Sequence, residues 1–183
     1  MVATQSSMIE IGTKASDFHL EDHQKNIFSL NNFENKPLFM MFICNHCPYV
    51  IHVIKKLVEL TEFAQENGIA CLAINSNDVE NYPEDSPEKM ISFAKKNNFN
   101  FPYLFDEKQE VAKAYKAACT PDFFLYNKDK RLFYRGQMDS SRPGNNKIVT
   151  GESLLRAIKD LLTGKTSPLD QKPSIGCNIK WKA

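Results

Sequence analysis

The sequence predicts an α/β fold in which helices flank a central mixed sheet. Apolar runs of strand length alternate along the chain with segments whose apolar residues recur at helical spacing, and this alternation is typical of α/β domains. The length of 183 residues fits one domain, and a content of 42% hydrophobic residues supplies a core that needs no disulfide or metal for stability.

The first core elements follow directly from the sequence. Residues 38–44 (LFMMFIC) are apolar throughout, as expected for a strand buried on both faces of a sheet. Residues 48–68 carry apolar positions at helical spacing and end at Gly68, a helix stop signal. Residues 69–75 (IACLAIN) predict a second buried strand.

The next helix has a defined start. Ser86 supplies an N-cap hydroxyl and Pro87 fits the first helical position, so we expect a helix from here to about Asn97. Residues 101–105 then predict a short strand, and residues 108–117 predict a short helix.

The C-terminal part predicts a hairpin, a helix and a tail. Residues 122–127 and 131–136 are two strand-like runs separated by three polar residues, which is typical of an antiparallel hairpin. Residues 151–164 predict a final amphipathic helix. We therefore expect a single domain over residues 1–164, including an N-terminal extension, and an extended C-terminal tail over residues 165–183.

Composition and charge exclude several classes of protein. Lys plus Arg (23) nearly balance Asp plus Glu (22), and the net charge of +1 argues against nucleic acid as a partner. No apolar run approaches the ~18 residues of a membrane helix, so we expect a soluble protein without a membrane partner. The absence of a basic segment before an apolar stretch, with an odd count of five cysteines, predicts a cytoplasmic protein with reduced thiols.

The strongest chemical signal is Cys44-Asn45-His46-Cys47, where a buried strand gives way to a helix. A helix N-terminus stabilises an anion, so a thiolate at Cys44 is expected to have a lowered pKa and to attack disulfides. Cys47 lies one turn later and is placed to close a ring with Cys44. His46, when protonated, adds a favourable charge and tunes the pKa. Buried structural cysteines and half of a zinc site stay open as alternatives, although no second CxxC or HxxxH supplies further ligands.

With Thr120-Pro121 before the strand at residues 122–127, this motif resembles the thioredoxin fold. The order is also similar: buried strand, CxxC, helix, strand, helix, then Thr-Pro and a hairpin. The resemblance implies that Cys44 is the nucleophile and Cys47 the resolving thiol. It also implies a cis peptide bond before Pro121 and contact of Thr120-Pro121 with the substrate.

Longer phrases narrow the resemblance to the peroxiredoxin-like (AhpC/TSA-type, redoxin) thiol-disulfide oxidoreductases. The similar phrases are IGTKASDFHLED, FICNHCPYV, NSNDVENYPEDSPEKM, TPDFFLYN, YRGQMD and GCNIKW. This family implies an N-terminal β-hairpin before the core and thiol-disulfide exchange without a bound cofactor. Its partners are protein or small-molecule thiols and disulfides, and electrons pass to or from a thiol system such as thioredoxin or glutathione.

The motif differs from that of true peroxiredoxins. Their reactive cysteine stands in a Thr-x-x-Cys pattern, and a distant Arg helps to hold the peroxide. Aligned on Cys47-Pro48, Cys44 takes the Thr position, and the segment Cys119-Thr120-Pro121 stands where the Arg would enter. Dithiol exchange is therefore preferred over the alternative, a thiol peroxidase in which Cys47 reacts with hydroperoxide and Cys44 resolves. A metal (copper) binding module that uses both cysteines and a histidine is a further alternative.

The sequence also predicts the roles of the remaining cysteines and of several polar and charged residues. Cys119, near the expected cis-proline, and Cys177, in the tail, are candidate accessory thiols, with inert thiols as the alternative, whereas Cys71 is expected in the core. Residues 75–78 end a strand on the side of the motif, where they either line a substrate groove or form a polar exit. Arg135 with Asp139 predicts a surface ion pair. The acidic run over residues 80–88 predicts a solvated loop and helix cap.

Overall fold

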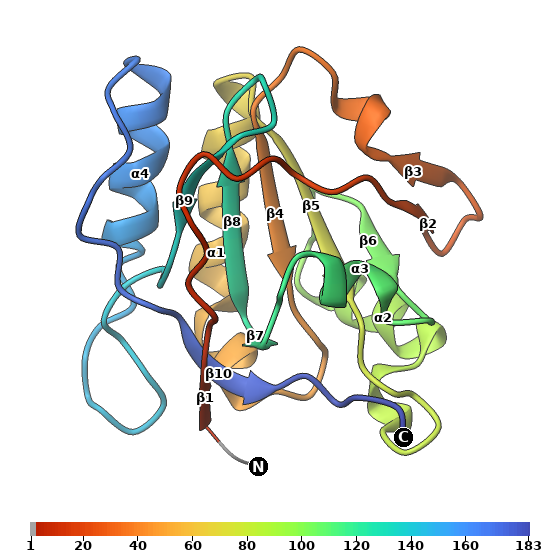
Figure 1. The fold of residues 1–183 in the computed structure, drawn as a ribbon. Helices are drawn as coiled ribbons and strands as arrows, with labels where there is room; N and C mark the ends of the chain where they lie inside the picture. The colour runs from red at the N-terminus through yellow and green to blue at the C-terminus, as the bar shows by residue number, and fades with distance from the viewer. Residues whose placement is uncertain (1–2) are drawn as a thin grey trace.

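The computed structural model describes residues 3–183, and a seven-stranded sheet forms its centre (Figure 1). The order of strands across this sheet is β3-β2-β6-β5-β4-β8-β9. In chain order they are β2 (His19–Glu21), β3 (Ile27–Ser29), β4 (Leu38–Phe42), β5 (Ala70–Asn75), β6 (Tyr103–Phe105), β8 (Asp122–Tyr126) and β9 (Leu132–Arg135).

Parallel pairs in the middle of the sheet are flanked by antiparallel pairs. β4 and β5 are parallel, as are β5 and β6. On the other side of β4, β8 and β9 form an antiparallel hairpin. β2 and β3 form the N-terminal hairpin, and β2 pairs antiparallel with β6. The predicted α/β fold with a central mixed sheet and an N-terminal hairpin is confirmed.

Helices and the N-terminal segment cover the two faces of the sheet. Leu57 of α1 (Pro48–Glu66) and Ile158 of α4 (Glu152–Leu162) belong to the core on one face, whereas Val111 of α3 (Glu110–Ala114) packs with Phe18 and Phe33 on the other. Every residue of β4 is buried because both of its faces are covered in this way. Among the described residues, no helix has the length and apolar character needed to cross a membrane. The helices are α1 (Pro48–Glu66), α2 (Pro87–Lys96), α3 (Glu110–Ala114) and α4 (Glu152–Leu162), with 3-10 turns η1 (Leu30–Phe33) and η2 (Pro83–Asp85).

A second, three-stranded sheet brings the C-terminal segment back to the domain. β10 (Ile175–Asn178) lies between β1 (Ala3–Gln5) and β7 (Cys119–Thr120) and is antiparallel to both. In Figure 1 these three strands lie together at the bottom of the view. The structure therefore places a strand, with neighbours on both sides, inside the segment predicted as an extended tail.

The prediction of a surface ion pair between Arg135 and Asp139 is wrong. Arg135 is fully buried and pairs with buried Asp122, with Nη2 3.0 Å from Oδ2. Its guanidinium also donates to the carbonyl oxygens of Tyr115 and Lys116, at 3.1 and 2.9 Å. A buried charge is tolerated when it is paired and hydrogen-bonded in this way. The carboxylate of Asp139 instead accepts backbone N–H groups from the loop before α4.

Arg135→Met is expected to lower the free energy of unfolding by ~3–5 kcal/mol, because it leaves the buried carboxylate of Asp122 without its partner. Adding Asp122→Asn should restore part of this loss by removing the orphaned charge. The control Arg156→Met changes an exposed arginine of α4, whose side chain is 75% exposed, and should alter stability by less than ~0.5 kcal/mol. Urea denaturation measures all three, and equal losses in the two single variants would contradict the prediction.

Candidate active site

The Cys44-Asn45-His46-Cys47 motif connects β4, an inner strand of the sheet, to α1. β4 ends at Phe42, and α1 begins at Pro48 with Cys47 as its N-cap residue. Cys44 therefore lies in the connecting loop, one turn before the helix. Both cysteines are buried, with exposed fractions of 1% for Cys44 and 0% for Cys47. Within the described residues, all five cysteines are thiols.

The Thr120-Pro121 segment contacts both thiols of the motif. Its peptide bond is cis, as the resemblance to thioredoxins implied. The side-chain oxygen Oγ1 of Thr120 lies 3.3 Å from Sγ of Cys44, and its carbonyl oxygen lies 3.1 Å from Sγ of Cys47. Residues that are more than 70 positions apart in the sequence are thus brought together, as predicted. Contact of this segment with a substrate stays a prediction.

The two thiols of the motif have opposite pKa shifts. A hydrogen bond with Cys44 lowers the pKa of Cys47 to about 5, with help from Cys177 and the backbone N–H of Val50 and against the effect of burial. The same hydrogen bond, together with burial and the charge of Asp85, raises the pKa of Cys44 well above its ordinary value. The helix N-terminus at Cys47 also stabilises an anion there. These interactions favour a thiolate at Cys47 and a proton on Cys44.

A buried carboxylate, Asp85, holds His46 beside the motif. Nδ1 of His46 lies 2.8 Å from Oδ2 of Asp85, and this interaction raises the pKa of His46 against a smaller effect of burial. Oδ1 of Asp85 accepts the backbone N–H of Asn45 at 2.8 Å. The imidazole also stacks on the ring of Tyr82, with 6.0 Å between centroids. The charge of Cys47 raises the pKa of His46 further, so a protonated His46 lies near this thiol, at the position where the sequence predicted a tuning histidine.

The expectation that residues 80–88 form a solvated loop is wrong at Asp85, which is fully buried. Sequence reasoning missed it because an acidic run is typical of solvated loops, and only the tertiary fold turns η2 toward the motif. The polar residues 75–78, at the end of β5 and just after it, are buried too, and their hydrogen bonds hold η2 in place. Asn77 donates to Oδ2 of Asp85 at 2.7 Å, and Asn75 donates to its carbonyl oxygen at 2.8 Å. Buried polar groups of this kind require hydrogen-bond partners, and here the side chains of Asn75 and Asn77 supply them to Asp85.

The two candidate accessory thiols have different surroundings. Sγ of Cys177 lies 2.7 Å from Sγ of Cys47, and burial together with Cys47 raises the pKa of Cys177 to about 12. Cys119 is fully buried with its sulfur 3.6 Å from the carbonyl oxygen of Pro121, and burial and Asp122 raise its pKa. The structure thus places Cys177 against the motif and Cys119 against the backbone of the cis-proline segment.

Three side chains at the site have the chemistry of metal ligands. Sγ of Cys44, a ring nitrogen of His46 and a carboxylate oxygen of Asp85 lie within 4.8 Å of one another. Thiolate, imidazole and carboxylate are ligands that zinc and copper accept. In this structure, however, Nδ1 of His46 lies within ion-pair distance of Asp85. The predicted copper-binding set shares Cys44 and the histidine with this cluster, but it has Cys47 where the cluster has Asp85.

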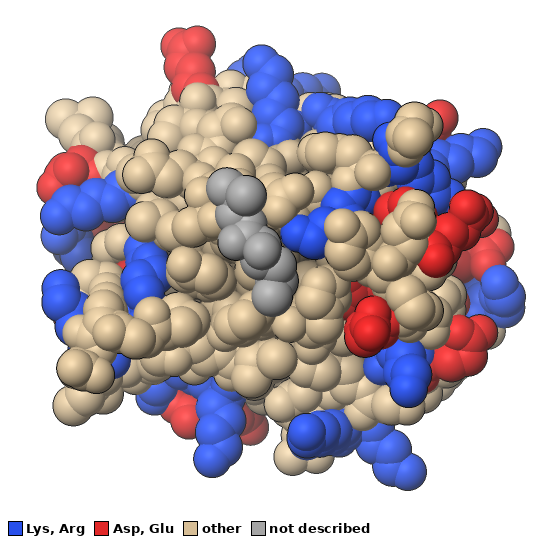
Figure 2. All heavy atoms as spheres, turned by 90° about the horizontal axis from the view of Figure 1, so that it is seen from below, with Lys and Arg blue, Asp and Glu red and all other residues tan. Residues whose placement is uncertain are grey.

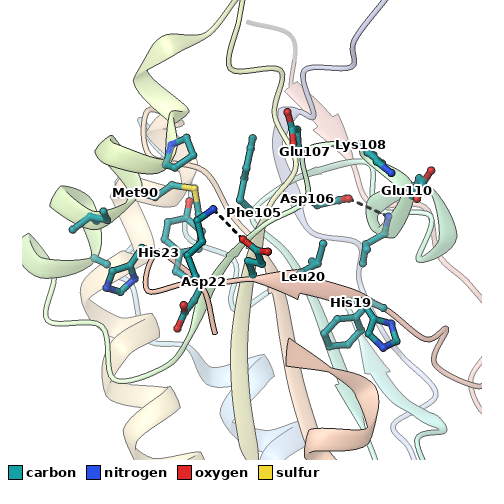
Figure 3. A pocket seen from close by; sticks show the side chains of 18 of the residues that line it. His19, Leu20, Asp22, His23, Met90, Phe105, Asp106, Glu107, Lys108 and Glu110 are labelled. Atoms are coloured by element: carbon teal, nitrogen blue, oxygen red, sulfur yellow. Dashed lines mark hydrogen bonds and ion pairs between the residues drawn. The ribbon is translucent and has the colours of Figure 1, made fainter. Parts of the chain in front are cut away.

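A separate cavity of about 980 Å³ lies between the N-terminal hairpin, α2 and α3 (Figure 3). The side chains of Asp22, His23, Met90, Phe105 and Glu110 are among those that line it, and none of the lining residues is a cysteine. The redox motif is therefore not part of this cavity. The face seen from below, to which β10 belongs, carries charged side chains mainly toward its margins (Figure 2).

Comparison with known proteins identifies relatives of this chain. "Thiol-disulfide oxidoreductase ResA" of Geobacillus thermodenitrificans is 26% identical over 159 residues, which are 87% of this chain and 80% of that protein. The crystal structure of an uncharacterized conserved protein of Geobacillus kaustophilus has 50% identity and a TM-score of 0.96, covering 100% of this chain and 97% of the other. The thioredoxin domain of a Bacteroides vulgatus thiol-disulfide oxidoreductase shares the fold, with a TM-score of 0.67 at 14% identity, covering 85% of this chain and 99% of that domain.

The sequence model of the AhpC/TSA family matches residues 11–135. This range runs from the segment before the N-terminal hairpin to the end of β9, and it contains both the CxxC motif and the cis-proline segment. The predicted thioredoxin-like fold and the predicted family are confirmed. The chain belongs to the AhpC/TSA family.

Proposed function

We propose that this protein is an oxidoreductase that performs thiol-disulfide exchange through Cys44 and Cys47. The observation that carries the proposal is the CxxC thiol pair at the start of α1, whose sulfurs lie 3.3 and 3.1 Å from oxygen atoms of Thr120 in the cis Thr120-Pro121 segment. The lowered pKa of Cys47 supports it. The thiolate is the attacking species in disulfide exchange, and a neighbouring protonated thiol supplies the second sulfur. Relatives named thiol-disulfide oxidoreductase support the same chemistry.

The reaction proceeds in two exchange steps. The thiolate of Cys47 attacks one sulfur of a substrate disulfide, the substrate S–S bond breaks, and the leaving sulfur takes up a proton. Cys44 then loses its proton and attacks Sγ of Cys47 in the mixed disulfide, which releases the second substrate thiol and forms the Cys44–Cys47 disulfide. The substrate disulfide is reduced to two thiols, and the protein dithiol is oxidised by two electrons.

The assignment of the attacking thiol differs from the one that the family resemblance implied. That resemblance gives the attack to Cys44, whereas the lowered pKa of Cys47 and its place at the helix N-cap favour the thiolate there. The opposing contact is the hydrogen bond that a protonated Cys47 donates to the carbonyl oxygen of Thr120. The carboxylate of Asp85 also disfavours a second anion at Cys44. We therefore propose Cys47 as the attacking sulfur and Cys44 as the resolving one.

We propose disulfides of proteins or small molecules as the substrate class, which the relatives named thiol-disulfide oxidoreductase support. We propose that electrons are exchanged with a cytoplasmic thiol system such as thioredoxin or glutathione. This requires no bound cofactor, because the two sulfurs carry the electron pair.

Hydroperoxide reduction is a second candidate function, favoured by the lowered pKa of Cys47 and by the AhpC/TSA family. The Cys47 thiolate would attack one peroxide oxygen, giving a sulfenic acid and an alcohol, and Cys44 would then form the disulfide with loss of water. True peroxiredoxins use an arginine to hold the peroxide. Here Arg135 of the β8–β9 hairpin is paired with Asp122 and donates hydrogen bonds to the carbonyl oxygens of Tyr115 and Lys116 instead. Thiol-disulfide exchange is therefore the better supported function.

Cys47→Ala is expected to reduce the rate of insulin disulfide reduction by at least ~10³-fold, because both exchange steps use its sulfur. Cys71→Ala is the matched control, since Cys71 is a buried cysteine of β5, and its rate should equal that of the wild type. Wild-type rates for insulin and for hydroperoxide, measured side by side, separate the two candidate functions. An active Cys47→Ala variant would contradict both.

The ultraviolet absorbance of the thiolate tests whether Cys47 or Cys44 carries the negative charge. In the reduced wild type it should be lost as the pH falls through about 5, the value to which the pKa of Cys47 is lowered. Cys44→Ala should raise this midpoint because it removes the largest cause of the lowering, whereas Cys44→Ser should raise it less because a serine hydroxyl still donates. If the low midpoint survives in Cys47→Ala but not in Cys44→Ser, the thiolate is at Cys44.

Asp85→Asn is expected to lower the pKa of His46 toward its ordinary value of ~6.5, since Asp85 is the main cause of the raised value. In the wild type, the stabilisation from this pair is complete below ~6.5 and is lost as the pH rises through the raised folded-state pKa. NMR titration of the imidazole measures the shift. Glu84→Gln, a neighbouring exposed acid, should leave the pKa unchanged, and an unchanged pKa in Asp85→Asn would sink the assignment.

A further inference from the structure

The C-terminal strand β10 places a third sulfur at the redox motif. Sγ of Cys177 lies 2.7 Å from Sγ of Cys47, about 0.7 Å longer than the 2.03–2.05 Å of an S–S bond. These residues are 130 positions apart in the sequence, so the contact is made by the fold and not by local chain geometry. Cys177 is 3% exposed, and its sulfur therefore faces the interior of the molecule together with that of Cys47.

Contacts of the surrounding backbone hold β10 close to the Thr120-Pro121 segment. Cys177 stands opposite Thr120 in the antiparallel register of β10 and β7. Gly176 permits this approach, because a Cβ at that position would lie 2.0 Å from the carbonyl oxygen of Thr120. Ser174 donates from Oγ to the carbonyl oxygen of Pro121 at 2.8 Å, and the backbone N–H of Lys180 donates to Oδ1 of Asn77 at 2.9 Å. Both ends of the strand are thus fixed to the walls of the site.

We propose that Cys177 is a third redox thiol, which takes over the disulfide from the CxxC pair by attack on Sγ of Cys47. This inference rests on the proposed function, since thiol-disulfide exchange supplies the Cys44–Cys47 disulfide. In the step, the Cys177–Cys47 bond forms and the Cys44–Cys47 bond breaks. The proton of Cys177 ends on Cys44. No electrons enter or leave, so the step needs no further oxidant or reductant.

Cys47 is the sulfur common to both disulfides, which agrees with its interactions with both of the other thiols. It contacts Cys177 directly and shares a hydrogen bond with Cys44. The released Cys44 is well suited to hold the proton, because burial and Asp85 disfavour its thiolate. Cys119 is not proposed as a partner, because its contact is with the carbonyl oxygen of Pro121.

The test uses Cys44→Ala with oxidised glutathione as the disulfide, followed by trapping of remaining thiols and peptide mapping. The inference predicts an intramolecular Cys47–Cys177 disulfide in Cys44→Ala and equally in the control Cys44→Ala/Cys119→Ala. Cys44→Ala/Cys177→Ala should stop at a glutathione mixed disulfide on Cys47. The inference is overturned if Cys44→Ala also stops there, with Cys177 recovered as an alkylated thiol.

Two further samples keep the inference separate from the proposed function and from any folding defect of the variants. Oxidised wild type should yield both Cys44–Cys47 and Cys47–Cys177 peptides, and a wild type with only the first would overturn the inference while leaving the function intact. Cys177→Ala should form the Cys44–Cys47 disulfide alone. If neither wild type nor Cys177→Ala forms that disulfide, the proposed function itself fails.

Discussion

The meeting of three chain segments at Thr120 is the constraint on which the site depends. The side chain of this residue contacts Cys44, its carbonyl oxygen contacts Cys47, and its backbone pairs with β10 opposite Cys177. The missing side chain of Gly176 allows the last of these contacts. Because one residue fixes the positions of three sulfurs, a displacement of the cis-proline segment would alter every thiol distance in the site at once.

Thr120 fixes the positions of the thiols, and Asp85 influences their charges. It is fully buried, yet its carboxylate is satisfied by the backbone of Asn45, by Asn77 and by His46. A negative charge here favours an imidazolium at His46 and disfavours a thiolate at Cys44. One carboxylate therefore sets the charge of the motif's histidine and directs the thiolate toward the helix N-terminus. The two effects have one cause, since a carboxylate in a region of low dielectric constant favours an opposite charge beside it and disfavours a like charge.

The elements that can be predicted from the sequence are those that depend on the local spacing of apolar residues. The apolar run that forms β4 and the helical spacing that forms α1 place the CxxC motif at a strand-to-helix junction without any knowledge of the fold. Arg135, Asp85 and β10 could not be predicted in this way. The burial of Arg135 depends on Asp122 and two carbonyl oxygens, and that of Asp85 depends on the exit of β5. Only the tertiary fold supplies such partners.

The separation of 130 positions between Cys47 and Cys177 gives the two disulfides unequal effects on the unfolded chain. By the chain-entropy estimate, a loop of that size restricts the unfolded ensemble by ~5 kcal/mol, against ~2 kcal/mol for the small CxxC ring. An unfolded chain therefore prefers the small ring by ~3 kcal/mol, and only native packing of β10 offsets this preference. The position of the disulfide is in this way linked to folding, and the large covalent loop would tie the C-terminal strand to the core and oppose its fraying.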